Sequence, residues 1–85
     1  MKYPMVYVEW VDSAGMAGWH RIEHTPDYHD PLECQSAGFL IHKDQKSITL
    51  ALQLTNSGQV GELMTIPRQC VRRMVKVKVP PSRSN

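Results

Sequence analysis

LMTIPRQCVRRMVKVKV, residues 63–79, is the stretch that decides the fold. Pro67 ends the strand-like pattern of its first part, because proline cannot donate a backbone hydrogen bond to a neighbouring strand. The next three residues, Arg68–Cys70, fit one short helical turn. Alternation with a period of two then returns over Val71–Val79, with three valines on one face and two lysines on the other. A strand, a proline-led turn and a closing strand are typical of the end of an SH3-like barrel.

Four more strands are predicted before this closing strand, and they cover residues 3–11, 33–42, 47–55 and 59–66. The clearest alternation runs over 47–55, where the residues that share one face are Ile48, Leu50, Leu52 and Leu54. Gly38 lies inside the second strand and indicates the bend or bulge that a small barrel needs in order to close. The Asn56–Gly58 turn joins the third and fourth strands as a hairpin.

Length and element order together predict one mostly β domain. Eighty-five residues, 41% hydrophobic and 21% charged, are typical of one folded globular domain. A long first connection and one helical turn before the last strand predict a single five-stranded SH3-like β-barrel over residues 1–79, followed by a mobile tail over residues 80–85. An OB-type barrel is the main alternative, but it usually inserts a helix between its third and fourth strands, and residues 56–59 leave no room for one.

The connection of about twenty residues between the first two strands, 12–31, is longer than ordinary loops, so it is either functional or folded against the barrel. It contains two aromatic residues, Trp19 and Tyr28. One interpretation is that Trp19 plugs the end of the barrel. The other is that Trp19 and Tyr28 frame a groove for a partner, with Tyr7 as a further exposed aromatic residue.

The same connection contains HRIEH, residues 20–24, which has the H-x-x-E-H order of inverted zinc peptidases. A wider cluster of potential ligands comprises His20, His24, His29, Asp27, Asp30 and Glu33. A long helix is excluded by Pro26 and by the glycine-rich segment before it, so a hydrophilic loop is the preferred interpretation. We therefore expect no metal and no cofactor.

Basic residues gather at the C-terminal end, although the net charge of the chain is only +2. From residue 68 onward no acidic residue occurs, and the predicted basic edge consists of Arg68, Arg72, Arg73, Lys76 and Lys78. Such a row could contact a nucleic-acid backbone in a salt-sensitive, sequence-independent way. Lysines on an edge strand also discourage aggregation, which requires no partner.

The sequence contains little that supports a membrane protein, an enzyme or a phosphate-binding protein. No stretch reaches the roughly 18 apolar residues of a membrane span, and no secretory signal is visible, so we expect a protein without a membrane partner. Cys34 and Cys70 are expected to be reduced, partly buried thiols, and no feature places a histidine beside Cys70. No glycine-rich loop has the setting or the lysine that phosphate binding requires. We expect no catalytic residues.

Four strings along the chain resemble a group of short uncharacterised small-barrel proteins encoded by tailed bacteriophages and prophages. They are VEWVDS (8–13), ECQSAGFLI (33–41), ITLALQL (48–54) and QVGELMTIPRQCV (59–71). The resemblance covers most of the chain and implies a phage accessory protein that acts in the host bacterial cytoplasm. It supplies no catalytic motif.

From these observations we expect a non-enzymatic module that binds and modulates a host bacterial protein. The alternative is a module for nucleic acid or a signalling nucleotide that uses the basic last strand and the loop aromatics. Pairing of exposed strand edges into a homo-oligomer is compatible with both. The candidate binding residues are Trp19, Tyr28, Tyr7, Arg68, Arg72, Arg73, Lys76 and Lys78.

Overall fold

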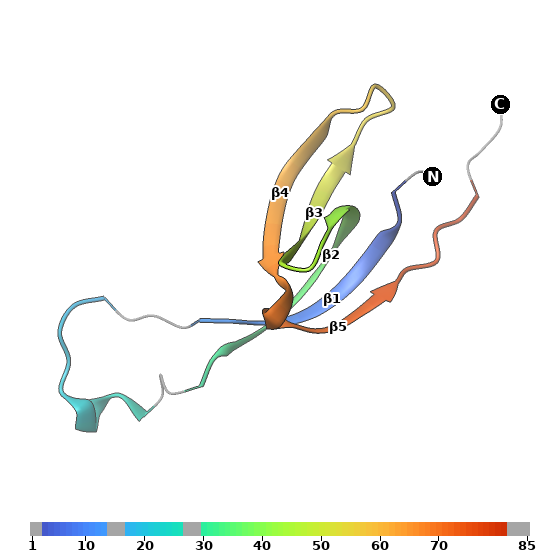
Figure 1. The fold of residues 1–85 in the computed structure, drawn as a ribbon. Coiled ribbons are helices and arrows are strands. Elements are labelled where there is room, and N and C mark those ends of the chain that lie inside the picture. Colours follow the sequence, from blue (N-terminus) through green and yellow to red (C-terminus); the bar gives the residue numbers. More distant parts are fainter. Residues whose placement is uncertain (1–2, 14–16, 27–29, 82–85) are drawn as a thin grey trace.

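A computed structural model of the chain describes residues 3–13, 17–26 and 30–81 (Figure 1). Its strands are β1 (Met5–Asp12), β2 (Leu32–Lys43), β3 (Ser47–Leu54), β4 (Val60–Pro67) and β5 (Val71–Lys76). Two three-residue 3-10 turns accompany them, η1 (Ile22–His24) and η3 (Arg68–Cys70). The five predicted strands and the helical turn before the last one are therefore confirmed, and the mostly β class with them. No helix in the described residues is long and apolar enough to cross a membrane.

The strands form one antiparallel sheet in the order β4-β3-β2-β1-β5. The expected closed barrel is not what the structure contains. β4 pairs with β3 and β5 pairs with β1, and within the described residues no ladder joins β4 to β5. The reason is geometric: the two strands meet only at η3 and leave it in different directions (Figure 1). The sheet is consequently open, with an edge strand on either side.

The core forms on one face of this bent sheet. Its buried members come from β1, β3 and β4, and they are Val6, Val8, Ile48, Leu50 and Ile66. The partly buried residues that pack against them are Trp10, Leu40, Cys70, Val71 and Met74. Alternation in β1 and β3 directs these side chains inward, and each large aliphatic side chain that becomes fully buried contributes roughly 1.5–3 kcal/mol. The body of the protein, by which we mean the five paired strands with η3, is stabilised by this one cluster.

Gly38 allows a close approach of two strands rather than a bulge. A Cβ atom added at this position would lie 2.8 Å from the carbonyl oxygen of Ala51 on β3. The register shift between β2 and β3 occurs further along, between Leu40 and His42. The irregularity predicted at Gly38 therefore occurs two residues later in β2. Glycine is needed at position 38 for a different reason, which is that another backbone comes this near.

The last strand, β5, contacts the core through fewer residues than the alternation over 71–79 predicts. β5 ends at Lys76, and the residues that pack against the core are Val71 and Met74. Val75 and Val77 are each 39% exposed. The β1–β5 ladder has a register shift between Glu9 and Trp10, so the alternation of 71–79 does not continue uniformly over the body.

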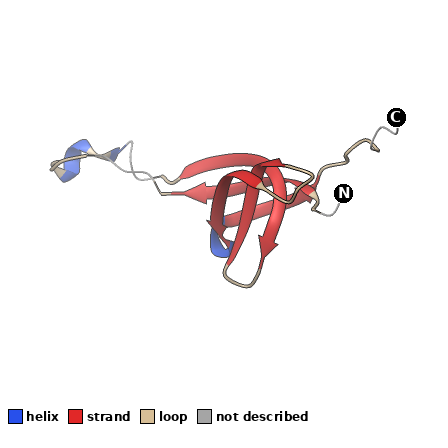
Figure 2. Ribbon diagram, turned by 90° about the horizontal axis from the view of Figure 1, so that it is seen from above, coloured by secondary structure: helices blue, strands red, loops and turns tan. Residues whose placement is uncertain are grey.

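β1 and β2 continue past the rest of the sheet as a two-stranded projection (Figures 1 and 2). Their pairing extends to Asp12 and Leu32, whereas β5 stops pairing with β1 at Trp10. Residues 17–26 lie at the far end, and the longest dimension of the molecule is 63 Å. The radius of gyration is 17.2 Å, against about 12 Å for a compact domain of this length. The long first connection is therefore not folded against the body.

Candidate functional site

The most exposed apolar residues of the chain lie on this projection. We call it the arm: the outer ends of β1 and β2, Val11–Asp12 and Leu32–Glu33, with residues 17–26 as its tip. Only two strands are paired here, so neither face of the arm is covered by a third element. The arm lacks a buried residue among those that the structure describes.

Local hydrogen bonds shape the tip. The η1 turn is held by the backbone N–H of His24, which donates to the carbonyl oxygen of Arg21 at 3.0 Å. The hydroxyl of Thr25 donates to the carbonyl oxygen of Ile22 at 2.8 Å. The ring Nε2 of His20 lies 2.6 Å from the carbonyl oxygen of Ala17. Each of these bonds joins two residues of the tip itself.

Trp19 and Ile22 project from the tip into solvent. Trp19 is fully exposed (102%) and Ile22 is 84% exposed. The interpretation of Trp19 as a plug for the barrel end is therefore wrong, because the arm carries it away from the core. The other tryptophan, Trp10, occupies a body position: it packs against the core, and its Nε1–H donates to the hydroxyl of Ser36 at 3.0 Å.

Part of the predicted site lies outside the described residues. This is true of Tyr28, the proposed second aromatic of the groove, and of Asp27 and His29 in the suggested metal cluster. Across 3–13, 17–26 and 30–81, no three or more histidine, cysteine, aspartate or glutamate side chains come together as a metal site would require. His24 is the last residue of η1 and His20 precedes this turn, which has three residues and is not a helix that would align the two side chains.

Tyr7 lies on the face of the sheet opposite the core, between β2 and β5. Partial burial and the nearby Glu9 carboxylate raise the pKa of its phenol. Arg73 approaches the same carboxylate, with 3.5 Å between its Nη1 and Glu9 Oε1. Tyr7 and Arg73, predicted from the sequence as separate binding residues, are thus neighbours on one surface through Glu9.

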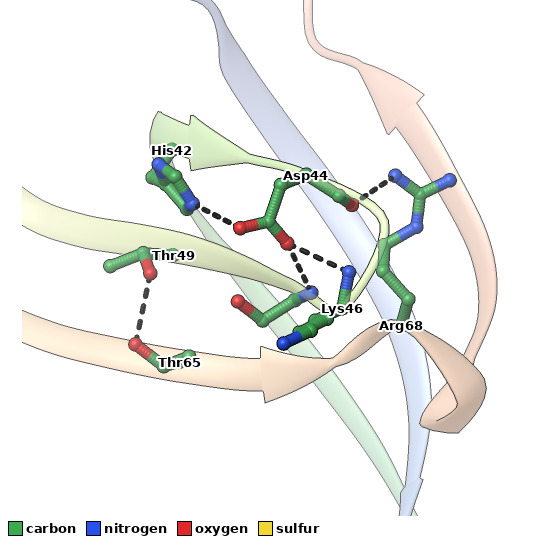
Figure 3. Close-up of polar contacts among 7 residues, drawn as sticks. His42, Asp44, Lys46, Thr49, Thr65 and Arg68 are labelled. Carbon is green, nitrogen blue, oxygen red and sulfur yellow. Dashed lines mark hydrogen bonds and ion pairs between the residues drawn. The ribbon is translucent and has the colours of Figure 1, made fainter.

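Arg68 belongs to a structural network rather than to a free basic edge (Figure 3). Its guanidinium Nη1 donates to the carbonyl oxygen of Asp44 at 3.1 Å, and its backbone N–H donates to the carbonyl oxygen of Lys46 at 2.9 Å. These two bonds attach η3 to the turn between β2 and β3. Arg68 therefore connects the end of β4 to the turn that precedes β3, at one end of the β3–β4 ladder.

Asp44 organises the same turn. One carboxylate oxygen accepts the backbone N–H groups of Lys46 and Ser47 at 2.7 and 2.8 Å, and the other lies 2.8 Å from His42 Nε2. The hydrogen bond from His42, followed by those from the Ser47 and Lys46 backbone, lowers the pKa of Asp44 to about 2. Sequence reasoning treated residues 43–46 only as a polar connection. The signal was present, since aspartate often caps its own turn in this way.

The remaining basic residues do not form one continuous row. Arg72 Nη1 donates to the carbonyl oxygen of Gln69 at 3.0 Å, and Arg73 faces Glu9. Lys76 lies opposite Val6 in the β1–β5 ladder, on the other face from Arg73, and Lys78 follows the strand. Of the five predicted cations, only Lys76 and Lys78 make no side-chain hydrogen bond or ion pair with the residues that the structure describes. The five predicted cations are therefore divided between internal contacts and two faces.

Both cysteines are free and partly buried. Cys70 packs against the core, and Cys34 lies on β2 with its thiol 3.7 Å from the carbonyl oxygen of Leu32.

Comparisons with protein-family models, curated proteins and solved structures found no match for this chain.

Proposed function

We propose that the chain is a non-enzymatic binding module that binds a partner protein through its arm. The observation that carries this proposal is the full exposure of Trp19 at the end of a projection that none of the described strands or turns covers. Tryptophan is the residue most often responsible for binding energy at protein interfaces, where it fills a pocket of the partner. Its exposure in a free chain costs solvation free energy that an interface would recover.

The chemistry of the tip specifies the kind of partner. Trp19 and Ile22 supply an apolar pair, and the exposed charged residues around them are Arg21 and Glu23. An apolar anchor surrounded by charges of both signs fits an apolar pocket with a polar rim. A surface of one charge, such as a nucleic-acid backbone, would instead be expected to select a uniformly basic tip. The resemblance to phage-encoded proteins supports a host bacterial protein as the partner.

An SH3-like relationship of the fold is part of the same proposal. It is supported by the strand order β4-β3-β2-β1-β5, by η3 between β4 and β5, and by the long connection between β1 and β2. Small β domains of this kind use the loops between strands for binding, while the sheet holds those loops in position. In this chain the long connection between β1 and β2 forms the tip of the arm.

The proposal predicts that Trp19→Ala abolishes capture of a specific protein. The tagged full chain is used as bait in nuclease-treated bacterial lysate, and Leu52→Ala serves as the control, because Leu52 is an exposed apolar residue on the body. We expect a protein that wild type and Leu52→Ala retain and that Trp19→Ala binds at least ~30-fold more weakly, since a tryptophan anchor contributes about 2 kcal/mol or more.

Two outcomes would contradict the proposal. One is equal capture by wild type and Trp19→Ala. The other is binding to labelled DNA or RNA that falls with rising salt and that Trp19→Ala does not change. The second outcome would favour the nucleic-acid alternative through Lys76 and Lys78.

A further inference from the structure

The two edges of the open sheet are the most unusual feature of the body. Among the residues that the structure describes, β4 has a hydrogen-bonded neighbour only in β3, and β5 only in β1. An edge strand presents unpaired backbone N–H and C=O groups along its free side, and these groups pair readily with a strand of another chain. β4 is eight residues long, which is long enough to support such a ladder.

Exposed apolar side chains are concentrated on these same edges. Outside the arm, the large apolar residues exposed on the described part of the chain are Leu52, Val60, Leu63, Met64, Val75 and Val77. All but Leu52 lie on β4, on β5 or directly after β5. Soluble proteins usually protect an edge with charge, proline or a covering segment. β4 has a single charged residue, Glu62, so most of this edge lacks such protection by charge.

Both edge strands carry apolar residues on both faces of the sheet. Cross-strand pairing places Leu63 of β4 and Val75 of β5 on the face away from the core. Met64 and Met74 lie on the core face of the same two strands. If the β4 edge of one copy joined the β5 edge of another, the sheet would continue with apolar side chains meeting on both faces.

Charge selects between pairing of like and unlike edges. In the described chain the one charged residue of β4 is Glu62, which is exposed. β5 carries Arg72, Arg73 and Lys76 and has no acidic residue. Pairing two β5 edges would bring these cations together, and like charges across a ladder are destabilising. Pairing β4 with β5 instead brings Glu62 towards a basic strand.

We propose that copies of this chain assemble head to tail, with the β4 edge of one copy paired to the β5 edge of the next. Such a contact leaves one free β4 edge and one free β5 edge at the ends of an open assembly, so addition continues until a ring closes. A ring closes at the number of copies that the angle between the two edges sets, and two copies close if both of their contacts form about one two-fold axis. The arms project from the bodies, so each copy in the assembly presents its own Trp19.

The mass of the full chain in solution tests this inference. Light scattering coupled to size-exclusion chromatography is expected to give a multiple of 9.7 kDa corresponding to two or more copies. Masses that grow with concentration would support the same contact without closure. A monomer at tens of micromolar overturns the proposal, and so does a discrete dimer whose mass Glu62→Lys leaves unchanged, because its contact does not join β4 to β5.

Charge reversal tests the two edges separately. Glu62→Lys and Lys76→Glu should each weaken assembly by about tenfold or more, because each sets like charges across the contact. The double variant should restore assembly. Glu23→Lys is the matched control: it makes the same substitution at an exposed position on the arm and should leave the mass unchanged. If circular dichroism shows folded single variants with an unaltered mass, the proposed contact is wrong.

Discussion

The body and the arm are built from the same two strands, β1 and β2, and yet they differ in almost every physical property. Within the body, β1 places Val6 and Val8 in the core with essentially no exposure. Beyond Trp10, the strands continue without a third neighbour, and the tip places Trp19 and Ile22 in solvent. The difference shows that strand pairing by itself does not bury side chains. Burial requires a further part of the sheet to bend over the strand.

The difference also separates stability from function. Residues of the body contact one another, so the free energy of unfolding depends on them. Residues of the tip contact mainly their own turn, so their substitution should change binding while the body stays folded. Three comparisons test this separation, each with a matched change in the arm or a conservative change at the same site.

Ile48→Ala should have the largest effect. Ile48 is fully buried in the core, and truncation leaves a cavity, so the free energy of unfolding should fall by about 2–5 kcal/mol. Ile22→Ala is the same substitution at the tip, where the side chain is 84% exposed, and should change stability by less than about 0.5 kcal/mol. Urea unfolding followed by circular dichroism measures both. Similar losses for the two variants would show that the arm packs against the body in solution.

Gly38→Ala should have an intermediate effect. The added methyl group would meet the Ala51 carbonyl oxygen at 2.8 Å, and that backbone cannot move without disturbing the β2–β3 ladder. Overpacking of this kind costs about 1–3 kcal/mol.

Gly18→Ala is the counterpart on the arm. Gly18 has a φ of 87°, so alanine strains the tip locally, but the nearest atom to the added Cβ is 3.9 Å away. Unfolding of the body should change by less than about 0.5 kcal/mol. A loss as large as that of Gly38→Ala would mean that the tip and the body unfold together.

The smallest effect should come from the pH dependence of Asp44. Its pKa in the folded protein is about 2, below the ordinary value of 3.8, so its turn stabilises the fold fully above about pH 4 and loses this contribution as pH falls towards 2. Asp44→Asn keeps an oxygen that can accept the Lys46 and Ser47 N–H groups but cannot titrate there. Urea midpoints between pH 5 and 2 should fall more steeply for wild type than for Asp44→Asn. Parallel slopes would contradict this role for Asp44.

Local patterns predicted the elements closely. The alternation around Val6 and Val8 and around Ile48 and Leu50 located two strands and their buried faces, and Pro67 located the turn before the last strand. The positions of the candidate binding residues were harder to predict. Trp19 was recognised as a candidate, but its position depends on how far β1 and β2 continue past β5. Arg68 was assigned to a basic edge, whereas the carbonyl oxygen of Asp44, 24 residues earlier, binds it in the turn.

By itself, then, the sequence determined what depends on near neighbours in the chain: strand periodicity and turns at glycine, proline and aspartate. Only the tertiary structure decided that the sheet stays open, that its edges carry the exposed apolar residues, and that the first connection projects as an arm. The physical reason is the range of the interactions. Alternation is set by backbone geometry over a few residues, whereas closure and burial depend on which distant strands meet, and here β4 and β5 diverge from η3 without meeting.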